Sequence, residues 1–90
     1  MYPLMSKQEV LSYLPTIIQY GVSERARKPD GFLSVYLSGK DIASLIYPGT
    51  SNTYIVEREQ FIKRHLAQYN KQKTIRRKLA LIAWAFNPTN

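Results

Sequence analysis

Two apolar stripes in the last third of the chain constrain its fold more than any other feature. The first follows helical spacing from Tyr54 to Tyr69, and the second from Ile75 to Phe86. Ile75 comes six residues after Tyr69, which would rotate the second stripe by about 240° on one continuous helix. We therefore expect a break near residues 70–74 and an antiparallel helical hairpin over residues 53–69 and 74–86.

A capping box predicts where the first helix begins. Ser6 and Glu9 are spaced so that each side chain can accept a hydrogen bond from the other residue's backbone amide. Apolar residues follow at helical spacing, but Pro15 lacks a donor amide, so we expect a kink there or two short helices meeting there. An acidic and a basic residue four positions apart then favour helix to about residue 28. The prediction is a kinked helix over residues 7–28.

Two shorter helices are expected in the middle of the chain. Residues 31–38 suit a helix or a strand, and we favour a helix because a lone strand has no partner. Apolar spacing predicts another helix over residues 41–47, followed by a loop over residues 48–52. The sequence thus predicts a single all-α domain over residues 1–90, a compact bundle of four to five short helices ending in a basic helical hairpin.

The positive charge is concentrated in the predicted hairpin. The chain has 13 Lys and Arg against 6 Asp and Glu, a formal net charge of +7. The first 59 residues hold six of each sign and cancel, so the whole +7 belongs to residues 60–90. This asymmetry is typical of a surface that binds nucleic acid, although such cations can also serve only to keep a helix soluble. The candidate phosphate-contacting residues are Lys63, Arg64, Lys71, Lys73, Arg76, Arg77 and Lys78.

Three of these cations lie in the first turn of the last predicted helix, where positive side chains interact unfavourably with the helix dipole. A first turn prefers acidic side chains, so Arg76, Arg77 and Lys78 cost up to about 1 kcal/mol there unless an anion binds. Free amides, the positive end of the dipole and cations together suit a phosphate. No helix carries the Asn, Gln and Arg pattern that reads base edges. We expect binding to DNA more than to RNA, largely without sequence readout.

The last helix is apolar on nearly all sides, which leaves a second interpretation open. Leu81 and Trp84 lie opposite its main apolar stripe. Such a helix is usually buried in a bundle, but if this face is exposed the two residues form a protein-contact patch. The protein would then be a virion component or small inhibitor that docks on an acidic protein surface. A homo-oligomer that covers the helix is a further alternative.

Catalytic and cofactor sites are not indicated. His65 is the single histidine and lies among apolar residues, so we expect a buried, hydrogen-bonded structural role. One histidine and no cysteine predict no metal site and no cofactor. Glu57 and Glu59 are expected in solvent, Glu59 paired with Lys63. Residues 38–41 lack the spacing of a phosphate-binding loop. We therefore expect a protein that is not an enzyme.

The sequence also predicts where the chain resides. Its apolar runs are far shorter than the ~20 residues that cross a bilayer, so no contact with a membrane is expected. The first residues lack the charged and apolar regions of a signal peptide. The absence of cysteine argues against a disulfide-stabilised secreted module. We therefore expect a cytoplasmic protein.

Part of the chain resembles a small uncharacterised helical domain of bacteriophage and prophage proteins. The resemblance rests on Gly31-Phe32-Leu33 with Tyr36, on FIKRHLAQ at residues 61–68, and above all on RRKLALIAWAF at residues 76–86. It runs from about residue 25 to residue 88. It implies a phage origin, a helical fold, a location in host cytoplasm or virion, and no established activity or functional residues. The resulting prediction is a small basic, phage-encoded nucleic-acid-binding protein.

Overall fold

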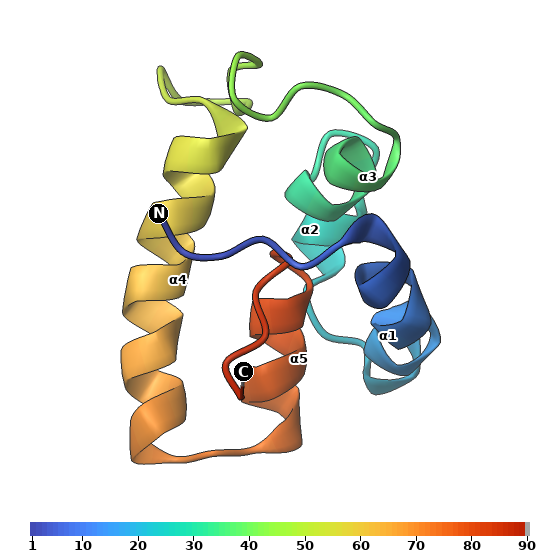
Figure 1. Ribbon diagram of the computed structural model, residues 1–90, viewed down its shortest axis with the longest axis vertical. Helices are drawn as coiled ribbons and strands as arrows, with labels where there is room; N and C mark the ends of the chain where they lie inside the picture. Colours follow the sequence, from blue (N-terminus) through green and yellow to red (C-terminus); the bar gives the residue numbers. More distant parts are fainter. Residues whose placement is uncertain (90) are drawn as a thin grey trace.

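The computed structural model describes residues 1–89, which form five helices joined by turns (Figure 1). The helices are α1 (Lys7–Tyr20), α2 (Glu24–Arg27), α3 (Phe32–Leu37), α4 (Tyr54–Lys71) and α5 (Ile75–Ile82). Within residues 1–89 the β-pairing is limited to one isolated bridge between Ile46 and Thr53. The predicted all-α fold class is therefore confirmed.

Helix α5 lies in the middle of the molecule, between α4 on one side and α1 on the other (Figure 1). Residues 72–74 connect α4 to α5, so the helix breaks within the region where the change of phase predicted a break. Thr53 and Thr74 cap the two helices, accepting from the amides of Val56 at 3.3 Å and Arg77 at 3.2 Å. Hydroxyl caps at both starts fix where each arm of the hairpin begins.

The end of α5 differs from the prediction. The helix stops at Ile82 rather than near residue 86. Ala85 has a left-handed backbone with φ of 58°, and the Phe86 amide donates back to the Leu81 carbonyl at 3.2 Å. This turn resembles the Schellman motif that ends many helices, with alanine at the left-handed position where glycine is usual.

The first helix also ends earlier than predicted. Ser6 and Glu9 form the expected capping box, and α1 continues through Pro15. It ends at Tyr20 because Gly21 adopts a left-handed conformation, with φ of 66°. The prediction of one helix over residues 7–28 is therefore wrong. The interruption lies at residues 21–23, and α2 is a separate single turn.

Residues 41–47 form turns rather than the predicted helix. The Asp41 carboxylate accepts from the Ser44 hydroxyl at 2.8 Å, which closes a local turn. The Tyr47 amide donates to the Asn52 carbonyl at 2.8 Å. Because the Tyr47 amide bonds across the loop, it does not donate to the carbonyl of Ala43, as a helix over residues 41–47 would require. The other short helix, predicted over residues 31–38, is present as α3.

A ladder of stacked aromatic rings crosses the core. Adjacent ring centroids lie 3.9 Å apart for His65 and Phe61, and 4.6 Å apart for Phe61 and Trp84. The stack continues to Phe32 at 5.0 Å and from there to Tyr36 at 5.6 Å. The interplanar angles lie between 14° and 20°. The ladder therefore joins α4, the turn after α5 and α3 in one packed unit.

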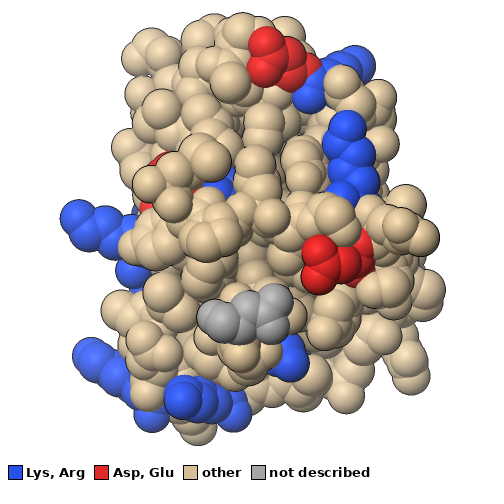
Figure 2. Space-filling model, in the orientation of Figure 1, with Lys and Arg blue, Asp and Glu red and all other residues tan. Residues whose placement is uncertain are grey.

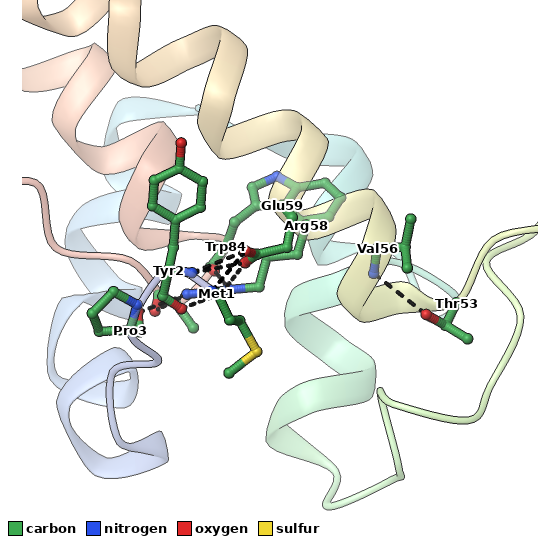
Figure 3. Close-up of polar contacts among 9 residues, drawn as sticks. Met1, Tyr2, Pro3, Thr53, Val56, Arg58, Glu59 and Trp84 are labelled. Atoms are coloured by element: carbon green, nitrogen blue, oxygen red, sulfur yellow. Dashed lines mark hydrogen bonds and ion pairs between the residues drawn. The ribbon is translucent and has the colours of Figure 1, made fainter.

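Arg58, in the second turn of α4, is fully buried and binds backbone from both ends of the chain (Figure 3). Its Nε donates to the Trp84 carbonyl at 2.7 Å, and its Nη2 donates to the Ala85 carbonyl at 3.0 Å. Towards the N-terminus, Nη1 donates to the Tyr2 carbonyl at 2.9 Å and Nη2 to the Pro3 carbonyl at 2.8 Å. One guanidinium thus holds residues 2–3 and 84–85 against α4.

Glu59 completes this cluster, contrary to the prediction that it pairs with Lys63. Its carboxylate accepts from Arg58 Nη1 at 2.9 Å and from the Tyr2 amide at 2.9 Å. The terminal amine lies 4.0 Å from the same carboxylate. Burial lowers the pKa of Arg58 below its ordinary value, and the Glu59 carboxylate opposes that effect. The buried cation therefore has both an ionic partner and carbonyl acceptors.

Candidate nucleic-acid interface

The outward face of α4 carries a row of exposed residues without an acidic group. The row consists of Gln60, Lys63, Arg64, Ala67, Gln68 and Lys71. Lys63 and Lys71 are eight residues apart, about 12 Å along the helix, which is close to the width of the major groove of B-DNA. Lys73, in the turn that follows, is also exposed. The basic face, defined as Lys63, Arg64, Lys71 and Lys73, therefore spans α4 and the turn.

Figure 2 shows Lys and Arg side chains gathered at the lower left, around the end of the molecule where α4 turns into α5. No acidic side chain is visible in the lower part of this view. Within residues 1–89, the carboxylates in ion pairs belong to Glu59 alone, so none forms an ion pair with the basic face. The positive field at this end is directed to solvent.

The two arginines at the start of α5 bind the protein itself. Arg76 Nη1 donates to the Tyr20 carbonyl at 2.8 Å and so supplies a cation at the C-terminal end of α1. Arg77 Nη1 donates to the Gln72 side-chain oxygen at 2.8 Å and to its backbone carbonyl at 3.2 Å. Lys78 is partly buried. Of the seven predicted phosphate-contacting residues, these three are the less available.

The predicted protein-contact patch is buried. Leu81 is fully inaccessible and packs with Ile62 and Tyr69, while Trp84 is only 7% exposed and lies between Phe32 and Phe61. The alternative required an exposed face at Leu81 and Trp84, and this condition is not met. Because α1 and α4 cover α5 within one chain, the apolar helix supplies no reason for an oligomer.

His65 ends the aromatic ladder and is half-buried rather than fully buried. Burial lowers the pKa of its imidazole, and the neighbouring Arg64 lowers it further. Its ring stacks on Phe61, so a packing role fits better than the hydrogen-bonded role that we predicted. Folding therefore favours the neutral imidazole more than the unfolded chain does.

Sequence reasoning missed Arg58, although a signal was present. Arg58 falls four residues after Tyr54 and four before Ile62, on the buried stripe of α4. A cation at such a position needs several acceptors, because an unpaired buried charge is very unfavourable. Its position on the buried stripe could therefore have identified Arg58 as a structural residue rather than as one more surface cation.

The described part of the chain shows neither a metal site nor a membrane-spanning helix. Residues 1–89 bring no three histidine, cysteine or acidic side chains together as a metal site, and none of their helices has the length and apolarity needed to cross a membrane. Comparison with protein families, curated proteins and solved structures found no match. The resemblance to a phage helical domain stays a prediction.

Replacing Arg76 with glutamine is expected to destabilise the fold. The variant loses the hydrogen bond to the Tyr20 carbonyl, so the free energy of unfolding should fall by about 1 kcal/mol. Lys73→Gln removes the same charge and should change it by less than about 0.5 kcal/mol. Urea denaturation measures both values. Equal effects of the two substitutions would show that Arg76 does not hold α5 to α1.

Stability should depend on pH through His65. Its pKa in the folded chain is below the ordinary 6.5, so the unfolded chain binds the proton more readily. The free energy of unfolding should therefore fall as the pH drops through 6.5 towards the folded pKa. Urea denaturation at about pH 7.5 and about pH 5 should show a smaller decrease for His65→Asn than for the parent. The same decrease in both proteins would contradict the assignment.

Proposed function

We propose that this protein is not an enzyme and binds nucleic acid through its basic face, with phosphates as the main contacts. The observation that carries the proposal is the row of exposed cations along α4 and the turn, with which no carboxylate of residues 1–89 forms an ion pair. Each phosphate that such a cation contacts releases condensed counterions, and this release favours binding. Duplex DNA is the preferred partner because its regular array of phosphates can meet the whole row.

Binding through this face is proposed to be largely independent of sequence. Three of its four cations are lysines, which act as point charges rather than as the rigid forks that recognise guanine edges. Affinity for duplex DNA is then expected in the range of non-specific binding, with Kd of roughly 10⁻⁴ to 10⁻⁶ M at physiological salt. A phage origin and a location in host cytoplasm or virion belong to the same proposal.

Docking on an acidic protein surface is the less supported alternative. It relied on Leu81 and Trp84 as apolar anchors, and the structure buries both side chains. Cations alone steer association more than they hold a protein partner. No other observation favours this alternative over nucleic acid.

The test compares two triple variants that remove the same charge. The face variant changes Lys63, Lys71 and Lys73 to glutamine, and the control changes Lys7, Lys28 and Lys40, which are also exposed. Arg76 and Arg77 are left intact because they bind protein carbonyls. Both variants have a net charge three units below +7, so a difference between them reports the position of the charge.

Titration with labelled duplex DNA at several salt concentrations is expected to separate the variants. The plot of log K against log salt should be less steep for the face variant than for the control, by about 3, because each lost phosphate contact removes about 0.9. Binding to duplexes of unrelated sequence should fall equally. If the face variant binds DNA as the control does, the basic face is not the interface.

A further inference from the structure

A second feature lies beside the basic face. A cleft of about 230 Å³ is bordered by α2, α4, the loop before α4 and the turn after α5. Its lining residues are Ser23, Arg25, Ala26, Tyr47, Glu57, Phe61, Arg64 and Trp84. Arg64 belongs to the basic face as well, so the cleft and the face are continuous. A strand that follows the face would reach the cleft.

Two guanidiniums line the cleft, and one is held in place. Arg25 Nε donates to the Tyr47 hydroxyl at 3.2 Å, and its guanidinium carbon lies 5.5 Å from the centre of the Tyr47 ring. This contact uses one donor edge and leaves the two Nη groups free to bind an anion as a fork. Neither Arg25 nor Arg64 has a carboxylate within ion-pair distance among residues 1–89.

Two further donors of the cleft have no acceptor within the described chain. Trp84 is 7% exposed, and its indole N–H donates no hydrogen bond within residues 1–89. Because no buried side-chain nitrogen or oxygen of residues 1–89 lacks a partner, this N–H is accessible to solvent. Ser23 precedes α2, but its hydroxyl does not cap that helix. Its backbone is left-handed with φ of 56°, a conformation that costs energy for serine.

Glu57 gives the cleft an acceptor beside these donors. Its Oε1 accepts from the Asn52 amide at 2.9 Å, and Oε2 is not engaged by that bond. A carboxylate repels phosphate but accepts hydrogen bonds from the exocyclic amino group of a base. Donors, one acceptor and aromatic walls therefore suit an anion that also carries an amino-bearing ring.

We propose that the cleft binds one nucleotide unit, with its phosphate held by Arg25 and Arg64 and its base directed to Trp84 and Glu57. This inference deepens the proposed function, on which it rests for the class of ligand. The volume is below the roughly 300–1,000 Å³ of pockets that enclose drug-sized ligands, so one unit is only partly enclosed and a longer segment does not fit. The unit can be a free nucleotide or the 5′ end of a single strand.

Trp84 is the single tryptophan of the chain, so its fluorescence reports on the cleft directly. The experiment titrates the full chain with cytidine 5′-monophosphate, with cytidine, and with a 5′-phosphorylated cytidine octamer. Arg25→Gln is the test variant, and Lys28→Gln removes the same charge from an exposed residue outside the cleft. Amide chemical shifts of Ser23 and Ala26 provide a second readout on the lining.

We expect a saturable change in Trp84 fluorescence with cytidine 5′-monophosphate. Arg25→Gln should weaken this binding roughly 10- to 100-fold, as expected for loss of a charged hydrogen-bond donor, and Lys28→Gln should leave it within about twofold. Cytidine should bind at least about tenfold more weakly, because it lacks the phosphate. If the octamer binds much more tightly than cytidine 5′-monophosphate, the ligand is a strand end. If the two bind equally, the ligand is a free nucleotide.

The inference is overturned if neither phosphorylated ligand gives a saturable change, if Arg25→Gln binds as well as Lys28→Gln, or if cytidine binds as well as its phosphate. Arg25→Gln should keep its salt-dependent binding of duplex DNA, and the triple lysine variant of the basic face should keep its binding of the nucleotide. If the protein binds duplex DNA but not the nucleotide, the proposal for the cleft is wrong and the proposed function stands. Nucleotide binding without duplex binding refutes the proposed function alone.

Discussion

The hydrogen bonds of the buried Arg58 guanidinium are the constraint on which the arrangement of the chain ends depends. They bring residues 2–3 and 84–85 to the second turn of α4, and the Met5 amide adds a bond to the Ala85 carbonyl at 2.8 Å. Held there, Trp84 stacks between Phe32 and Phe61 and links α3 to α4. A buried carbonyl left without a donor costs about 1–3 kcal/mol. Arg58 supplies a donor to the buried Trp84 carbonyl and to the partly buried carbonyls of Tyr2 and Pro3, so this arrangement is strongly preferred.

The same chemistry separates structural cations from available ones. Arg58, Arg76 and Arg77 all donate to carbonyl groups, and the planar fork of arginine suits several acceptors at once. The lysines of the basic face remain in solvent, as expected for strongly hydrated point charges. The net charge of +7 therefore overstates the number of cations available for binding, because some of the arginines hold helices together. We therefore assign the phosphate contacts to α4 and the turn after it, and the cleft adds the guanidinium of Arg25, which Tyr47 holds in place.

Local patterns in the sequence predicted the parts of the fold that depend on local physics. Helical periodicity and a change of phase predicted the α4–α5 hairpin, and the capping box predicted the start of α1. The early end of α1 is a local left-handed turn at Gly21, whereas the other failures depend on longer-range contacts. Residues 41–47 bond across a loop, and α5 is covered on both sides, which buries Leu81 and Trp84. Composition indicated the basic face, but it could not show which arginines bind the protein or that Arg25 and Arg64 line one cleft.

Urea denaturation of Arg58→Met tests the central claim most directly. Methionine fills much of the same space but donates no hydrogen bond, so the four carbonyls and Glu59 lose their shared donor. The free energy of unfolding should fall by roughly 3–5 kcal/mol, whereas Arg64→Met, on the exposed face of α4, should change it by less than about 0.5 kcal/mol. A decrease of less than about 1 kcal/mol for Arg58→Met would contradict the account, because such a value is typical of one ordinary hydrogen bond.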